Sequence, residues 1–367
     1  MNILHTESSK GWGGQEIRIL REAEGMRKRG HDVILAVNIG GGLIPRAREA
    51  GFTVYELPFK KVSALKTIYR LIQICKQHQI QLINTHSSLD AWIGGIAARI
   101  AKKKVIRTRH LSTPIRKGWN SRILYRTLAD FVVTTSTPIM KTIGKQAGLP
   151  PFRLKCVPTG IDPHLFKADL LKAAEFRASL GVGPSDILVG TACFMRSWKG
   201  INDLLHAAVM LKERKEIKWV IVGGGHIDDY RAKIPELGLE KIVTFTGHLE
   251  APFSAIRAMD IFVLLSTAHE GVSQASLQAA FLERPLVTTT IGGLPEVCLD
   301  GINGLVIPPH SPDSVAKAVL KLAESPHLRV EYGSNGKKHV EEKFTIRQTL
   351  DEMENIYHLV YPNNFIS

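Results

Sequence analysis

The segment FMRSWKG (194–200) comes directly after the apolar run ILVGTAC (187–193), and a helical pattern begins at Ile201. A short apolar run, then a polar turn and an amphipathic pattern, indicates one strand–turn–helix unit. Units of this kind recur along the chain on both sides of this one. Their alternation favours parallel sheets whose strands are joined by right-handed helical crossovers.

The apolar runs fall into two groups separated by the turn-rich segment PTGIDP (158–163). The predicted strands are 2–5, 32–37, 53–57, 81–85, 104–109 and 130–135 in the first group, and 187–193, 217–222, 242–246, 260–266 and 286–290 in the second. The fold class is therefore α/β, with two Rossmann-like doubly wound domains facing a cleft. We expect one domain over 1–164 and the other over 165–344, with a C-terminal helix (345–367) packing back on the first. Ligands of such sheets bind outside the carboxyl ends of the strands.

The composition excludes several classes of protein. Of 367 residues, 44% are hydrophobic and 22% charged, which suits buried cores and not a disordered chain. No apolar run approaches the 18 or so residues of a membrane-spanning helix, and the N-terminus does not have the pattern of a signal peptide. The four cysteines have no metal-binding spacing, so we expect reduced thiols, no bound metal and a cytoplasmic protein.

The net charge of +14 is unevenly distributed. Residues 1–165 hold 27 lysines and arginines against 10 acidic residues, whereas residues 166–367 hold 21 against 24. A basic half is typical of proteins that meet nucleic acid, an anionic membrane or an acidic small molecule, although a plain solvated basic surface also fits.

Four loops follow predicted strands and carry candidate site residues. Glycines in GWGGQE (11–16) let backbone amides approach an anion at a helix start, or simply make a tight turn. Arg196 and Lys199 are spaced to grip a diphosphate. Glu270 and Gln278, in the segment TAHEGVSQASLQ (267–278) around a helix entrance, suit the hydroxyls of a sugar or ribose. The segment TIGGLPE (290–296) repeats the strand–glycine–helix pattern.

Taken in order, these motifs, together with VGGG (222–225) and FTG (245–247), resemble the family-four glycosyltransferases of the GT-B fold. The similarity is greatest to the bacterial branch that builds lipopolysaccharide and other cell-surface glycans. It implies transfer of a hexose-type sugar, with retention, from a nucleotide-diphosphate sugar and without an essential metal or other cofactor. UDP is the nucleotide that family frequency favours.

The resemblance also implies roles for particular residues. Arg196 and Lys199 would bind and stabilise the leaving diphosphate, Glu270 would hold donor-sugar hydroxyls, and His110 would face the donor sugar. The remaining donor-binding residues would be Gly13, Gly14, Gly223, Gly247, Gly271, Val272, Ser273 and Gln278.

Two positions depart from the family pattern. Gln278 stands where a glutamate usually grips the ribose hydroxyls, so we expect nucleotide binding weaker by ~1 kcal/mol. Glu283 stands where the family commonly has glycine, which raises the question of how the local turn is made.

The basic half contains one stretch, 116–126, that mixes cations with aromatic and aliphatic residues. Such a mixture is typical of a helix at a bilayer interface, although a buried helix with a basic outer face has the same composition. We hypothesise an anionic-membrane and acceptor surface at Arg116, Lys117, Trp119, Arg122, Tyr125 and Arg126. The protein would then be peripheral on the cytoplasmic face of the inner membrane and act on a lipid-linked or lipopolysaccharide-type acceptor.

Two other functions compete with transfer. A nucleotide-sugar epimerase could share the fold and would need no acceptor. A nucleic-acid-binding protein would explain the charge, but the sequence has no helix-turn-helix, RNA-recognition or zinc pattern, so we expect no nucleic-acid partner.

Overall fold

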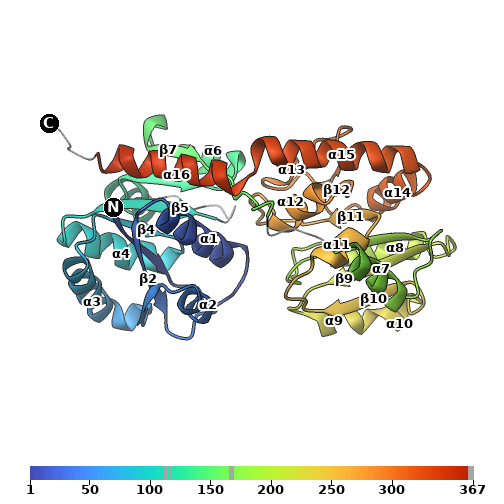
Figure 1. The fold of residues 1–367 in the computed structure, drawn as a ribbon, viewed down its shortest axis with the longest axis horizontal. Coiled ribbons are helices and arrows are strands. Elements are labelled where there is room, and N and C mark those ends of the chain that lie inside the picture. Colours follow the sequence, from blue (N-terminus) through green and yellow to red (C-terminus); the bar gives the residue numbers. More distant parts are fainter. Residues whose placement is uncertain (111–114, 116–117, 165–168, 363–367) are drawn as a thin grey trace. The chain divides into compact units, whose positions relative to one another are not determined.

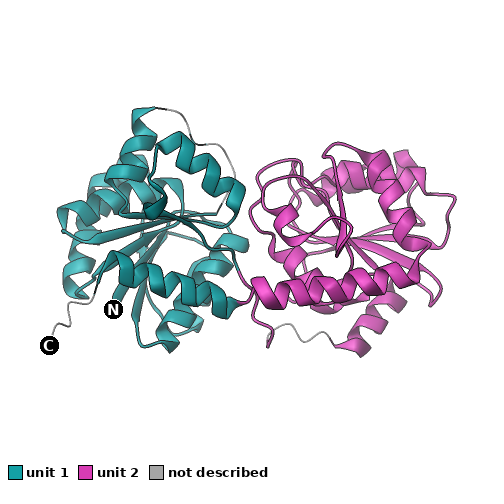
Figure 2. Ribbon diagram, turned by 90° about the horizontal axis from the view of Figure 1, so that it is seen from above, with its two compact units in different colours: residues 1–159, 346–367 teal, residues 160–345 magenta. Residues whose placement is uncertain are grey.

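The computed structural model describes residues 1–110, 115, 118–164 and 169–362, and it divides the chain into two compact units. Unit 1 comprises residues 1–159 and 346–367, and unit 2 comprises residues 160–345 (Figure 2). Each unit is built around its own parallel sheet with helices on both faces, as the alternation in the sequence predicts (Figure 1).

Unit 1 has a seven-stranded sheet in the order β3-β2-β1-β4-β5-β6-β7, and every pairing is parallel. Its elements are β1 (Asn2–Glu7), α1 (Gly14–Lys28), β2 (Asp32–Asn38), α2 (Leu43–Glu49), β3 (Thr53–Leu57), η1 (Lys61–Ser63), α3 (Ala64–Gln77), β4 (Leu82–Thr85), α4 (Ser88–Ile100), β5 (Lys104–Arg109), α5 (Trp119–Arg122), η2 (Ile123–Thr127), β6 (Phe131–Thr134), α6 (Thr137–Ala147), η3 (Pro151–Arg153), β7 (Leu154–Cys156) and α16 (Ile346–Val360).

Two apolar layers cover the faces of this sheet. Side chains of α1, α2 and α16 fill one layer, and those of α3, α4, η2 and α6 fill the other. Helix α16 belongs to unit 1 although it is last in the chain, and it packs beside α1 (Figure 1). Here Tyr357 donates a 2.5 Å hydrogen bond to Glu22, which also bonds Arg18.

Unit 2 has a six-stranded sheet in the order β10-β9-β8-β11-β12-β13, again with parallel pairings. Its elements are α7 (Leu170–Ser179), β8 (Ile187–Ala192), α8 (Ile201–Met210), β9 (Ile217–Val222), α9 (Ile227–Arg231), α10 (Lys233–Leu237), β10 (Val243–Gly247), α11 (Phe253–Ala258), β11 (Ile261–Leu264), α12 (Gln274–Phe281), β12 (Leu286–Thr289), α13 (Leu294–Val297), β13 (Gly304–Ile307), α14 (Pro312–Ala323) and α15 (Pro326–Lys343).

The order of the strands in unit 2 reverses between β8 and β11, both of which are central and buried. A crevice at the carboxyl ends of strands forms at such a reversal, because the two flanking connections leave in opposite directions. The loops after β8 and β11 carry Arg196, Lys199 and Glu270, so the fold brings the sequence-predicted residues of this unit to one edge. The predicted α/β class and its strands are confirmed, and the structure adds two edge strands, β7 and β13.

Among the described residues, no helix is both long and apolar enough to cross a bilayer. All four cysteines are free thiols.

Candidate active site

The loops after β8 and β11 in unit 2 are locked together by backbone contacts. The amide of Thr267 donates a 2.8 Å hydrogen bond to the carbonyl of Trp198. Gly200 has a left-handed φ of +69°, and a Cβ at this position would lie 2.0 Å from the carbonyl oxygen of Leu265. Glycine is therefore required at 200, because only its missing side chain lets the two loops approach this closely.

Lys199 and Glu270 form an ion pair across these two loops. Their side chains are only 18% and 8% exposed, so the loss of either partner would leave the other as a largely buried charge without compensation. Ser266 donates a 2.7 Å hydrogen bond to the same carboxylate oxygen, and its own carbonyl accepts a 2.6 Å bond from Thr289. The carboxylate of Glu270 is thus held from two sides.

The backbone of Glu270 is held as firmly as its side chain. A Cβ on Gly292, whose φ is +57°, would lie 1.9 Å from the carbonyl oxygen of Glu270. The preceding residue, His269, has a left-handed φ of 62° and packs edge-on against Trp198 with ring centroids 5.3 Å apart. Backbone strain of this kind gathers at functional sites.

Helix α12 begins immediately after this loop. Ser273 caps it by accepting a 3.3 Å hydrogen bond from the amide of Ser276, and Val272 and Ser273 are buried at the helix entrance with Gly271 before them. Gln278 lies on α12, half-buried, one turn beyond the first residues of the helix. The helix start offers backbone amides to an anion or a hydroxyl, and Gln278 offers an amide group.

The turn after α12 is made without glycine. Glu283 adopts a left-handed φ of 60°, which costs about 1–2 kcal/mol for a residue with a side chain. Its carboxylate lies 3.1 Å from Lys337 and 3.5 Å from Arg257. Burial acts to raise the pKa of Glu283, but these cations outweigh it and lower the pKa. The departure from the family glycine is therefore accommodated with the turn intact.

Arg196 lies on the same loop as Lys199 but against aromatic side chains. Its guanidinium lies over the rings of Trp198 and Phe194, 5.1 and 5.4 Å from their centroids. It lines a cavity of about 650 Å³ together with Tyr230, Lys233 and neighbouring residues of α8 and α9. The structure thus places the two sequence-predicted cations on one loop but gives them different neighbours: Lys199 is paired with Glu270, and Arg196 lies against aromatic rings.

The glycines after β9 and β10 meet at the same edge of the sheet. The amide of Gly223 donates a 2.8 Å hydrogen bond to the carbonyl of Gly247. Gly223 has a φ of +134°, and a Cβ there would lie 1.9 Å from the carbonyl oxygen of Cys193, at the end of β8. This glycine packs the β9 loop against the loop that carries Arg196 and Lys199.

In unit 1, the glycine turn lies between β1 and α1. The amide of Gly13 is already bonded to Glu16, at 2.9 Å. Gly14 has no heavy atom within 4 Å of where its Cβ would be, so packing alone does not require glycine there. Open space at this position is compatible with close approach of a ligand.

Beneath this turn lies a buried pair of carboxyl groups, Glu7 and Asp90. Glu7 accepts hydrogen bonds from the Ser9 amide (2.6 Å), Gln15 (2.5 Å) and Ser87. Burial, followed by the charge of Asp90, raises the pKa of Glu7 to about 8. The hydrogen bonds that Glu7 accepts tie the turn and the starts of α1 and α4 to the end of β1.

His110 follows β5 and is the end of a row of three buried histidines. His5 Nδ1 lies 2.8 Å from His86 Nε2, and His86 Nδ1 lies 3.0 Å from His110 Nε2. Burial, with the charges of Arg18, Arg107 and Arg109, lowers the pKa of His110 well below its ordinary value, and the pKa values of His5 and His86 are also lowered, chiefly by burial.

The spacing of these nitrogens does not suit a shared metal. Two histidine nitrogens on one tetrahedral zinc lie about 3.3 Å apart, whereas these pairs are closer and point at one another. Within the described ranges, no group of three or more His, Cys, Asp or Glu residues is arranged to hold a metal ion.

The predicted membrane surface is partly corrected by the structure. Trp119 is 80% exposed, and Arg122 and Arg126 are exposed beside it. Tyr125 is 1% exposed, and its hydroxyl accepts a 3.1 Å hydrogen bond from Arg109. The prediction that Tyr125 contacts a membrane is therefore wrong, because this residue of η2 is buried in the apolar layer of unit 1. Arg116 and Lys117 lie outside the described residues.

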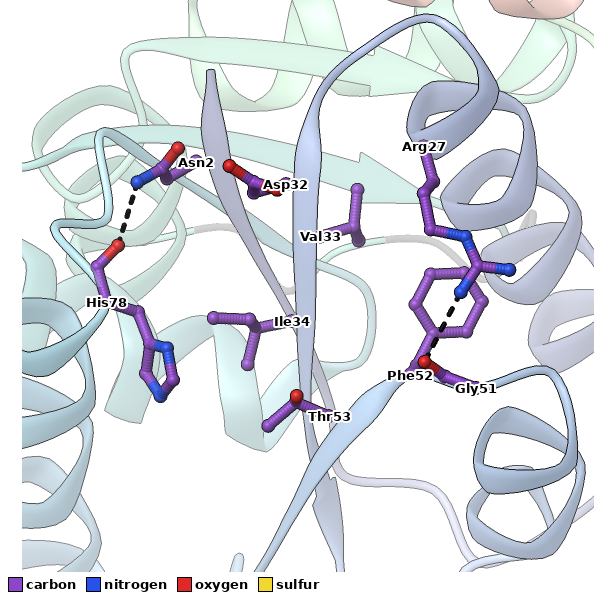
Figure 3. Close-up of a pocket in the computed structure, with 9 residues that line it drawn as sticks. All are labelled: Asn2, Arg27, Asp32, Val33, Ile34, Gly51, Phe52, Thr53 and His78. Atoms are coloured by element: carbon purple, nitrogen blue, oxygen red, sulfur yellow. Dashed lines mark hydrogen bonds between the residues drawn. The ribbon is translucent and has the colours of Figure 1, made fainter.

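A second cavity, of about 330 Å³, lies at the opposite edge of the unit 1 sheet (Figure 3). Asn2, Asp32 and Thr53, which line it, are at the amino ends of β1, β2 and β3. Its polar groups bond the protein's own backbone: Asn2 donates to the carbonyl of His78 at 2.9 Å, and Arg27 donates to that of Gly51 at 3.3 Å. This cavity is thus remote from the strand ends that carry the candidate residues.

Comparison with known proteins finds glycosyltransferase matches in both units. Residues 12–165 match the family model "Glycosyltransferase Family 4", and residues 186–325 match "Glycosyl transferases group 1". An uncharacterized glycosyltransferase of Methanocaldococcus jannaschii, MJ1607, is 24% identical over 94% of each chain. The capsular polysaccharide biosynthesis glycosyltransferase CapM of Staphylococcus aureus is 24% identical over 92% of each chain.

Among solved structures, Anabaena HepE in complex with UDP superimposes with a TM-score of 0.87 at 21% identity, covering 98% of this chain and all of that one. HepE has also been solved with UDP-glucose.

Proposed function

The chain belongs to the family-four glycosyltransferases of the GT-B fold, and on this premise we propose that unit 2 binds the diphosphate of a UDP-sugar through Lys199. The observation that carries the proposal is the Lys199–Glu270 ion pair at the carboxyl ends of β8 and β11. An incoming diphosphate competes with Glu270 for the ammonium group. Once displaced, the carboxylate is free to accept hydrogen bonds from sugar hydroxyls.

The remaining residues extend this assignment. Gly271, Val272 and Ser273 directly precede α12, and we propose that their amides bind the donor, while Gln278 would bond the ribose. We propose that Arg196 turns from its aromatic neighbours to the diphosphate when donor binds. The glycine turn at Gly14 and the ring of His110 would serve the sugar from unit 1.

The reaction we propose is retaining transfer of a hexose without a metal. Negative charge grows on the leaving phosphate as the bond to the anomeric carbon breaks, and Lys199 and Arg196 would stabilise that charge electrostatically. The leaving phosphate would accept the proton of the acceptor hydroxyl on the same face of the sugar, which requires no second carboxylate below the anomeric carbon.

The test is a thermal-shift screen of the full chain against UDP, GDP, ADP and UDP-glucose in EDTA, followed by product analysis. We expect UDP to raise the melting temperature in wild type and not in Lys199→Ala. NMR of UDP-glucose incubated alone would detect an epimerase, because epimers have equal mass but different spectra. The anomeric configuration of a transferred sugar, also read by NMR, decides retention. Stabilisation only in the presence of Mg²⁺ would contradict the proposal.

We further propose that unit 1 binds an anionic bilayer and takes a lipid-linked acceptor from it. Val62 and Leu65 are 95% and 84% exposed on η1 and α3, next to exposed Lys61 and Lys66. This surface and Trp119 of α5 both follow carboxyl ends of strands, and both elements lie in the helical layer on the same face of the sheet. Exposed apolar side chains among cations match an anionic interface in both polarity and charge. The name of CapM, which refers to capsular polysaccharide, supports a cell-surface acceptor.

Vesicle co-sedimentation tests the membrane assignment. Wild type should bind vesicles containing phosphatidylglycerol, and added salt should release it. Leu65→Ser and Trp119→Ser should weaken binding, whereas Val330→Ser, at a 73% exposed apolar position of unit 2, should not. Equal binding to pure phosphatidylcholine vesicles would refute a role for charge.

A further inference from the structure

The three buried histidines of unit 1 lie on adjacent strands. His5 is on β1, His86 directly follows β4, and His110 directly follows β5; these strands are neighbours in the sheet. Their rings are nearly parallel, with interplanar angles of 11° and 29° and centroids 5.1 and 5.3 Å apart. The backbone amide of His86 donates a 2.8 Å hydrogen bond to Asp90, which holds the backbone that carries the middle ring.

A neutral imidazole has one donor and one acceptor nitrogen, so this row can be ordered in only two ways. In the first, His5 Nδ1–H donates to His86, His86 Nδ1–H donates to His110 Nε2, and His110 carries its own proton on Nδ1. In the second, every proton is on the opposite nitrogen, and the row ends with a proton on His5 Nε2.

The inner end of the row decides between these two orders. Within the described part of the chain, His5 Nε2 is buried and has no hydrogen-bond partner. A buried N–H without an acceptor is among the rarest features of folded proteins, whereas an acceptor lone pair without a donor is tolerated more often. The first order is therefore favoured.

We propose that His86 is a positioning residue that fixes His110 as a neutral tautomer with its proton on Nδ1, ready to donate a hydrogen bond to a substrate hydroxyl. A neutral N–H donor suits a hydroxyl oxygen, whereas a charged imidazolium would favour phosphate. The role of His110 toward a sugar rests on the proposed function, but its tautomer does not.

Two variants separate positioning from packing. His86→Asn keeps an amide donor close to the place of Nδ1, and His86→Leu removes the donor; both lose the bond to His5. Comparable melting temperatures for the two variants would show that any difference in His110 comes from the donor.

The first readout is the ring ¹⁵N spectrum of protein labelled at histidine, with His110 assigned from His110→Ala. We expect a protonated Nδ1 on His110 in wild type and in His86→Asn, and loss of this single tautomer in His86→Leu. A proton on Nε2 of His110 in wild type would overturn the inference whatever the enzyme's activity.

The second readout is turnover of UDP-glucose. His86→Leu should lower kcat/KM by ~3- to 10-fold, the effect of one neutral hydrogen bond, and His86→Asn should recover most of it. The same change made in His110→Ala should have no further effect, because His86 acts through His110. Additive losses would contradict positioning. A wild-type protein inactive on all UDP-sugars would count against the proposed function and leave the tautomer measurement to decide this inference.

Discussion

The two units share one topology, yet they solve the problem of polar groups at the strand ends in opposite ways. At the carboxyl ends of its strands, unit 2 has a pair of oppositely charged side chains, Lys199 and Glu270. At the ends of β1 and β5, unit 1 instead holds groups that burial neutralises: the pKa of Glu7 is raised to about 8 by burial and Asp90, and burial lowers the pKa of His110. The buried charges of Arg18 and Glu22 in α1 are paired with each other. A charged ligand can replace one partner of an ion pair, whereas hydrogen bonds between neutral side chains hold those side chains in one arrangement. The comparison teaches that the two units differ in the electrostatics of their loops and not in their fold, and this difference is why we propose unit 2 as the site of the diphosphate.

The largest expected effect comes from removing the cation of unit 2. Lys199→Ala should lower kcat/KM by about 10²–10³-fold, since it removes charge stabilisation from the leaving group. Lys233→Ala, in the cavity beside Arg196, is the matched control and should change kcat/KM by less than about threefold. Steady-state assays with UDP-glucose measure both. Equal losses would show that general positive charge, and not this pair, matters.

A steric test of the same loop should have the next largest effect. Gly292→Ala forces a Cβ against the carbonyl of Glu270 and also strains a left-handed φ, so we expect a loss of about 3 kcal/mol of unfolding free energy. Gly238→Ala has a similar φ of +65° but open space around its Cβ, and it should cost only about 1 kcal/mol. Urea denaturation compares the two. If both variants are equally stable, the close packing under Glu270 is not important.

A pH test addresses the neutral network of unit 1. Folded Glu7 keeps its proton up to a pKa of about 8, whereas in the unfolded chain the carboxyl is ionised above about 4.5. The folded state therefore binds more protons in this range, and stability falls as pH rises toward 8, by at most about 1.4 kcal/mol per pH unit.

Glu7→Gln should remove this slope between pH 7 and 8, where unfolded histidines are already mostly neutral. Glu49→Gln, at an exposed position of α2, should leave it unchanged. Denaturation at the two pH values checks both variants. A slope that persists in Glu7→Gln would mean that Glu7 is ionised in the folded protein. The claim that unit 1 has a neutral network would then be wrong.

The smallest effect is expected at Gln278. Gln278→Glu would add a charge-assisted hydrogen bond to a ribose hydroxyl and should tighten UDP binding about fivefold, or ~1 kcal/mol. Calorimetric titration with UDP measures this change. Weaker binding would indicate that glutamine is suited to a different nucleotide or pose.

The sequence predicted the fold well because buried parallel strands are continuous apolar runs, and these are visible without tertiary information. The two strands it missed, β7 and β13, are short edge strands of three and four residues, and none of the three residues of β7 is buried. Tyr125 was misplaced because Arg122 and Arg126 make its segment look like a basic surface, whereas Leu124 and Tyr125 are the buried residues of η2.

The candidate site could be predicted only where local motifs carry it. Arg196, Lys199 and Glu270 each follow a recognisable strand, so their common edge was predictable. The pairing of Lys199 with Glu270, rather than with Arg196, depends on contacts between loops 71 residues apart. His5 and His86 are 81 residues apart in the sequence, and no spacing rule connects them to His110.

A crystal structure of the full chain with UDP-glucose, grown in EDTA, tests the central claim most directly. We predict that the diphosphate lies at the carboxyl ends of β8 and β11 within hydrogen-bond distance of the Lys199 ammonium, with the Glu270 carboxylate released toward the sugar. A diphosphate bound elsewhere, or an intact Lys199–Glu270 pair beside bound donor, would contradict it.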